Sequence, residues 1–146
     1  MNYYNDITEL SSDEINFLLD LAKRLELNPE PSALKGKVLG LLFLNPSLRT
    51  MTSFQSAMIR LGGGSFVVSP DMSIHGLETR DGVIMDGKSA EHIKEAIPVI
   101  SSYSDVIGIR SFAKMNNLND DIEDCEYKKL INLVAVSYTH LRAHET

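Results

Sequence analysis

Residues 38–54 read VLGLLFLNPSLRTMTSF, and this stretch decides the fold. The run at 38–44 is apolar without alternation, which is typical of a strand buried on both faces of a parallel sheet. Pro46 cannot continue a central strand, and Ser47 is a favourable N-cap for a helix. Apolar residues then recur at helical spacing, at Met51, Phe54, Met58 and Leu61. The stretch therefore predicts a strand-to-helix turn at the carboxyl edge of an α/β sheet, where open sheets of this class bind ligands.

The predicted turn carries side chains that suit an anion. The first turn of a helix leaves backbone N–H groups unpaired, and the helix dipole favours negative charge there. Ser47, Thr50 and Thr52 can add hydroxyl donors, and Arg49 adds a planar cation that can bind a phosphate at two points. The alternative is an ordinary N-cap followed by a solvent-exposed arginine. The local chemistry alone leaves both interpretations open.

Three ordered blocks resemble a known enzyme family. Residues 43–54 resemble the carbamoyl-phosphate motif Ser-x-Arg-Thr-Arg of the aspartate/ornithine carbamoyltransferases. Residues 82–87 (GVIMDG), followed by Glu91-His92, resemble the N-acetylornithine and N-succinylornithine branch, and residues 105–112 (DVIGIRSF) also fall in register. The resemblance implies transfer of a carbamoyl group from carbamoyl phosphate to the side-chain amine of an N-acylated ornithine. It further implies a role in arginine biosynthesis and no cofactor.

The resemblance also implies roles for individual residues. Carbamoyl phosphate is expected to bind Ser47, Leu48, Thr50 and Arg110, with Arg49 bridging its phosphate and its carbonyl oxygen. The expected catalytic residues are Arg49, Thr50 and Arg110. A role for Arg110 also follows from its position, because a residue just after a buried parallel strand lies at the same sheet edge as the motif.

Two positions depart from the family pattern, and a third leaves the acyl group of the substrate undetermined. His75 stands where the acylornithine branch has a tryptophan, which a neighbouring subunit contributes to the site. A histidine there can still donate a hydrogen bond to phosphate. Met51 replaces the second arginine of the motif, and its place on the apolar stripe predicts packing. Ala90 occupies the position that discriminates acyl groups, where glutamate is usual for acetyl and proline for succinyl, so it favours neither substrate.

Two other functions stay open from the sequence. The first is a plain ornithine or aspartate carbamoyltransferase, which the sequence MDG at 85–87 disfavours. The second is a module that binds phosphate or another anion without catalysing transfer.

The remaining apolar patterns complete the predicted fold. Ser11 and Glu14 have capping-box spacing and open a first helix, and further helices are expected at 89–102 and 116–129. The first helix is predicted to bury Ile15, Leu18, Leu19, Ala22 and Leu25. Strands are expected at 38–44, 65–69, 105–109 and 130–136. This order predicts an α/β fold with a parallel four-stranded sheet and helices on both faces.

Length and composition limit the number of domains and the classes of site and partner. The 146 residues suffice for one domain, and the single cysteine excludes an internal disulfide framework and a thiolate metal site. The net charge of −6 argues against a nucleic-acid partner. The absence of a signal peptide or a membrane-spanning run makes a cytoplasmic location the default expectation.

The end of the chain fits no pattern of the family. Residues 137–146 resemble translated adaptor sequence and are interpreted as a non-native tail. His140 and His144 have helical metal-pair spacing but no third ligand, so no metal site is expected. Residues 1–136 are therefore expected to form a carbamoyl-phosphate-binding domain. The resemblance implies that a second domain, absent here, binds the amino-acid substrate, and that the complete enzyme is a homotrimer.

Overall fold

A parallel three-stranded sheet forms the centre of the molecule. The computed structural model describes residues 4, 6–69, 76–79, 82–85, 89, 91–112, 115, 117–123 and 125–142. The strands lie in the order β2 (Gly64–Val68), β1 (Val38–Phe43) and β5 (Val106–Arg110), so the earliest strand is central. A separate parallel pair joins β3 (Leu77–Glu78) to β4 (Glu91–His92). The predicted parallel arrangement is confirmed for these three main strands.

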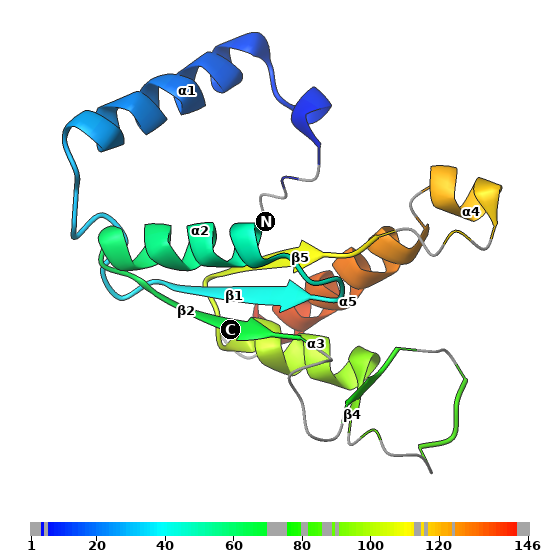
Figure 1. Cartoon of the computed structure of the whole chain (residues 1–146). Helices are drawn as coiled ribbons and strands as arrows, with labels where there is room; N and C mark the ends of the chain where they lie inside the picture. Colours follow the sequence, from blue (N-terminus) through cyan, green and yellow to red (C-terminus); the bar gives the residue numbers. More distant parts are fainter. Residues whose placement is uncertain are drawn as a thin grey trace.

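Helices cover both faces of this sheet, as predicted. Figure 1 shows α2 (Leu48–Arg60) along one face, and α3 (Ile93–Ser102) and α5 (Cys125–Arg142) along the other. Alternate residues of β1 pack against the helices on opposite faces of the sheet, because successive side chains of a strand point to opposite faces. Leu42 packs in a cluster with residues of α3 and α5, whereas Leu41 and Phe43 pack with Met58 of α2. The unbroken apolar run at β1 is thus explained by burial from both sides.

The predicted fourth strand is wrong. Residues 130–136 belong to α5, and α4 (Leu118–Ile122) precedes that helix. Leu130 and Val134, one helical turn apart, are both buried against the cluster that contains Ile93 and Ile97 of α3. A short apolar run fits a helix face as well as a strand, so periodicity alone does not distinguish them. The main sheet therefore has three strands within the described chain, where four were expected.

The first helix forms where predicted but does not bury its apolar stripe. After the short 3-10 helix η1 (Ile7–Glu9), α1 (Ser12–Leu27) begins with the expected capping box. The N–H of Ser11 donates to Glu14 Oε2 at 2.8 Å. No residue of α1 is buried, and Leu19 remains 55% exposed. Figure 1 shows the reason, since α1 lies beyond α2 and apart from the sheet. Amphipathic spacing specifies an apolar face but not a partner for it.

An ion pair joins β1 and β5 at the opposite edge of the sheet from the predicted motif. Lys37 Nζ lies 2.7 Å from Asp105 Oδ1, and the N–H of Val38 donates to Asp105 Oδ2 at 2.9 Å. The hydrogen bond from Lys37, followed by that from Val38, holds the pKa of the Asp105 carboxyl below its ordinary value. The charged form of Asp105 is therefore favoured in the folded chain.

We expect replacement of this carboxylate to flatten the acid dependence of stability. Because the pKa of Asp105 is lower in the folded than in the unfolded chain, its contribution is present above the ordinary value of 3.8. That contribution is lost as the pH falls through the lowered pKa. Urea unfolding at about pH 7 and about pH 3 should show a smaller drop in unfolding free energy for Asp105→Asn than for wild type.

Asp20→Asn is the matched control for this measurement. Asp20 is 78% exposed and lies 3.8 Å from Lys23, a geometry that contributes little. Its acid dependence should match that of wild type. Equal acid dependence in Asp105→Asn and wild type contradicts the assignment.

In the described part of the chain, no helix is both long enough and apolar enough to cross a bilayer.

Candidate functional site

The amino end of α2 and the carboxyl ends of β1 and β5 meet at one edge of the sheet. Phe43 at the end of β1 is in register with Arg110 at the end of β5. The N–H of Leu44 then donates to the Arg110 carbonyl at 2.9 Å, which extends the ladder by one bond. Ser47 follows after a short turn as the N-cap of α2. The motif and Arg110 therefore share the edge where open α/β sheets bind ligands.

The first turn of α2 lacks a side-chain cap. Ser47 has the extended backbone of an N-cap, with φ −157° and ψ 95°, but its side chain makes no capping hydrogen bond. Its hydroxyl instead donates to Thr50 Oγ1 at 2.9 Å, and the first helical bond runs from the Met51 N–H to the Ser47 carbonyl at 3.0 Å. Among the described residues, no side chain caps the N–H groups of this first turn, which is the arrangement that binds anions at helix N-termini.

The hydroxyl groups of the motif differ in what they offer a ligand. Thr50 Oγ1 accepts from Ser47, so its own proton is not used in that bond. The Thr52 hydroxyl donates to the carbonyl oxygens of Leu48 and Arg49, at 2.9 and 3.2 Å. In this conformation the Thr52 proton is bound within the helix, so the donor role expected of Thr52 stays a prediction that requires its hydroxyl to rotate. Met51 packs against the cluster on the α2 face of the sheet, as predicted.

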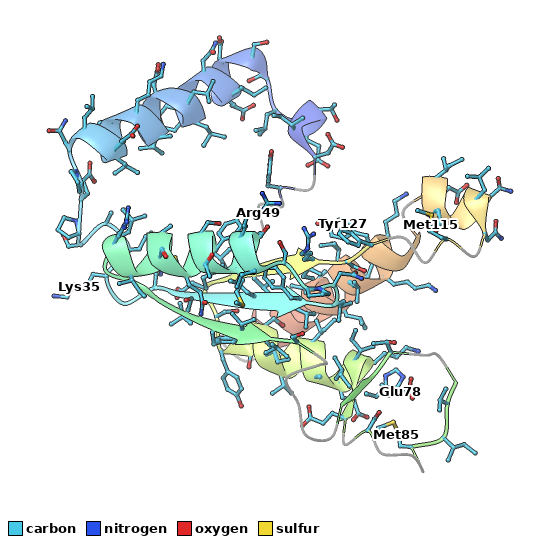
Figure 2. The ribbon with its side chains drawn as sticks, viewed as in Figure 1. Lys35, Arg49, Glu78, Met85, Met115 and Tyr127 are labelled. Carbon is cyan, nitrogen blue, oxygen red and sulfur yellow. The ribbon has the colours of Figure 1, made fainter. Side chains whose placement is uncertain are left out.

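Arg49 places a cation on the first turn of α2. Figure 2 shows it at the amino end of this helix, and its side chain is exposed. Leu48 beside it is also exposed, at 72%. Arg49 makes no ion pair with any residue that the structure describes. Its charge is therefore free to meet an external anion.

Arg110 is held at the same edge in a different way. Its guanidinium carbon lies 4.6 Å from the centroid of the Phe112 ring, and its buried Nε has no hydrogen-bond partner among the residues that the structure describes. It also has no acidic partner within the described ranges. Leaving a buried donor unsatisfied is unfavourable, so such a group in a folded protein commonly has a functional role. Two arginines that pair with no acidic side chain in the described part of the chain thus lie at one edge of a protein whose net charge is −6.

Sequence reasoning missed the contact that links the two strand ends. Asn45 Oδ1 accepts the N–H of Phe112 at 2.7 Å, across 67 positions of the sequence. The only signal in the sequence is a polar residue between an apolar run and Pro46, and nothing in that signal indicates its partner.

The weaker candidates are not tested by the structure. His75 and Ala90 lie outside the described residues. The adjacent His92 accepts the Lys94 N–H on its Nδ1 at 3.1 Å and so caps α3. Within the described ranges, no group of three or more His, Cys, Asp or Glu side chains is placed to hold a metal ion.

Comparison with known proteins identifies the family. The model of the carbamoyl-phosphate-binding domain of aspartate/ornithine carbamoyltransferases matches residues 4–141. The N-acetylornithine carbamoyltransferase of Xanthomonas campestris pv. campestris is 37% identical over 124 residues, covering 85% of this chain and 37% of the relative. The N-succinylornithine carbamoyltransferase of Bacteroides fragilis is 38% identical over 119 residues, covering 82% and 36%.

Solved structures agree with this assignment. A crystal structure of an N-acetyl-L-ornithine transcarbamylase variant complexed with PALAO superposes with a TM-score of 0.77 at 35% identity. The match covers 91% of this chain and 40% of that one, so the chain spans less than half the length of the proteins it matches. The family match, these relatives and the shared fold lead to one conclusion: the chain belongs to the aspartate/ornithine carbamoyltransferase family and carries its carbamoyl-phosphate-binding domain.

Proposed function

We propose that this chain supplies the carbamoyl-phosphate half of an active site that transfers the carbamoyl group to the side-chain amine of an N-acylated ornithine. The observation that carries the proposal is the meeting of two cationic features at one sheet edge. Among the described residues, no side chain caps the amino end of α2, and Arg110 at the same sheet edge has a buried Nε without a hydrogen-bond partner. Both features suit a dianionic phosphate group.

The proposed chemistry needs positioning and positive charge more than covalent help. The amine nitrogen attacks the carbonyl carbon of the mixed anhydride, the bond from that carbon to the phosphate oxygen breaks, and phosphate leaves with the electron pair. The amine gives up one proton to solvent. Negative charge grows on the carbonyl oxygen and on the departing phosphate, so preorganised donors at those oxygens lower the barrier.

Each residue of the motif has a proposed task. The phosphate oxygens are bound by the hydroxyls of Ser47 and Thr50, by the first backbone N–H groups of α2 starting at Leu48, and by Arg110. Arg49 bridges the phosphate and the carbonyl oxygen, so it stabilises both charges as the bond breaks. The hydrogen bond of 2.9 Å between Ser47 and Thr50 supports this assignment, because it holds the two hydroxyls together at the helix start.

The domain assignment stays a prediction. We propose that residues 1–136 form the carbamoyl-phosphate-binding domain and that a second domain of the complete enzyme binds the amino acid. The non-native origin of residues 137–146, the homotrimer, the cytoplasmic location and the link to arginine biosynthesis rest on sequence and resemblance. From resemblance alone, we likewise propose that His75 of a neighbouring subunit contacts the phosphate and that Ala90 lies at the acyl group of the substrate.

The acceptor amine can be identified by direct assay of the full-length enzyme. Acetylornithine and succinylornithine relatives both match this chain, at 37% and 38% identity. One related transcarbamylase was crystallised with acetylcitrulline, and a glutamate-to-alanine variant with carbamyl phosphate and N-succinyl-L-norvaline. With carbamoyl phosphate as donor, we expect N-acetylornithine or N-succinylornithine to be carbamoylated, and ornithine and aspartate to be poor acceptors.

Two outcomes of this assay support the alternatives. Efficient use of ornithine or aspartate indicates a plain carbamoyltransferase. Binding of carbamoyl phosphate in calorimetry, with no transfer to any of the four amines, indicates a non-catalytic anion-binding module.

A further inference from the structure

Asn45 ends the central ladder with a side chain. The last main-chain bond runs from the Leu44 N–H to the Arg110 carbonyl at 2.9 Å. In a continuing parallel ladder, the Phe112 N–H would next donate to a main-chain carbonyl of β1. Asn45 Oδ1 takes that place at 2.7 Å. The chain can therefore leave the sheet at Pro46 while the Phe112 amide remains hydrogen-bonded.

Phe112 in turn supports Arg110. The guanidinium carbon of Arg110 lies 4.6 Å from the centroid of the Phe112 ring. Stacking of a planar guanidinium on an aromatic face is attractive and restricts the orientation of the plane. Since the Nε of this guanidinium is buried and has no acceptor, its orientation decides which N–H groups remain for a ligand. Any displacement of the Phe112 backbone thus moves the ring on which the Arg110 guanidinium stacks.

We propose that Asn45 is a positioning residue for the anion site. It lies two residues before Ser47 and holds the backbone of Phe112, so one side chain connects the turn into α2 with the platform beneath Arg110. Asn45 fixes the Arg110 guanidinium relative to the amino end of α2 and makes no contact with the anion itself. This inference rests on the proposed function of the same site.

The test measures two properties of the 146-residue chain: its affinity for phosphate and the rate of hydrogen exchange at Phe112 and Arg110. Calorimetry with inorganic phosphate as probe should show binding about five- to tenfold weaker in Asn45→Ala than in wild type, as expected when one hydrogen bond is lost. Hydrogen exchange followed by NMR should be faster in Asn45→Ala than in wild type at the Phe112 amide and at the Arg110 Nε–H.

Phe112→Leu retains the hydrogen bond from the main chain to Asn45 but removes the ring. It should therefore weaken phosphate binding and speed exchange at the Arg110 Nε–H alone. Asn132→Ala, an exposed asparagine of α5, is the control and should match wild type in all three readouts.

The outcomes separate this inference from the proposed function. If wild type binds neither inorganic phosphate nor carbamoyl phosphate, the proposed function fails, and this inference fails with it. If wild type binds phosphate and Asn45→Ala binds as tightly with unchanged Nε–H exchange, only the positioning role is overturned. A purely structural role lowers the melting temperature of Asn45→Ala and leaves its phosphate affinity intact. Should Asn45→Ala not fold, Phe112→Leu decides, and wild-type affinity in that variant overturns the inference.

Discussion

Replacing Arg49 with alanine in the full-length transferase is expected to lower kcat by about two to three orders of magnitude, the usual effect of removing one preorganised donor from a developing negative charge. Arg49 is exposed on the first turn of α2 and pairs with no acidic side chain in the described part of the chain. In the proposed reaction its guanidinium meets charge on both the phosphate and the carbonyl oxygen. Steady-state kinetics with saturating carbamoyl phosphate and amine measure the change.

Arg60→Ala is the matched control for Arg49→Ala. Arg60 is an exposed arginine at the last turn of the same helix. Its removal changes the net charge by the same amount but leaves the sheet edge intact, so kcat should stay close to wild type. Lysine at position 49 should recover only part of the activity, because an ammonium group cannot bind two oxygens as a planar fork does. Near-normal turnover of Arg49→Ala refutes the assigned role.

Truncating Leu42 to alanine is expected to lower the free energy of unfolding of the chain by about 2–5 kcal/mol. Leu42 is fully buried near the carboxyl end of β1 and packs with residues of α3 and α5. The variant loses the transfer free energy of the deleted atoms and leaves a cavity between the sheet and two helices. Equilibrium unfolding in urea, monitored by circular dichroism, gives the difference.

Ile59→Ala supplies the comparison for this core substitution. Ile59 is 72% exposed on α2, so the same kind of truncation removes little buried surface. Its unfolding free energy should lie within about 0.5 kcal/mol of wild type. A loss in Leu42→Ala no larger than that in Ile59→Ala contradicts the packing of β1 against α3 and α5.

Local patterns were sufficient to predict the centre of the fold. An apolar run without alternation indicated burial on both faces, and β1 is buried by α2 on one side and by α3 and α5 on the other. The same reasoning failed at residues 130–136, which lie in α5. That run is short and apolar, and only the tertiary contact of Leu130 and Val134 with α3 reveals its helical period.

The prediction that α1 buries its apolar stripe was wrong for a different reason. Its helical spacing and its Ser11–Glu14 cap are present, yet Leu18 and Leu19 stay 48% and 55% exposed. Propensity, capping and amphipathic spacing are properties of the segment itself. Burial depends on what the rest of the molecule places against that segment, and no pattern within the segment contains this information.

The common sheet edge of the motif and Arg110 was predictable, but the contacts around them were not. The carboxyl ends of parallel strands meet at one edge, so the order of strand, motif and later strand indicated that Ser47 and Arg110 lie at the same edge of the sheet. The bond between Asn45 and Phe112 joins residues 67 positions apart, beyond the reach of any local pattern. The bonds from the Thr52 hydroxyl to carbonyl groups of its own helix were likewise not predicted.

The most direct test of the anion site is an NMR titration of the isotopically labelled 146-residue chain with carbamoyl phosphate. The largest shifts are expected at the backbone amides of Leu48, Arg49 and Thr50 and at the side-chain Nε–H of Arg110, all saturating with one dissociation constant. Absence of shifts at these four groups, or a saturable response confined to a different part of the chain, contradicts phosphate binding at the amino end of α2.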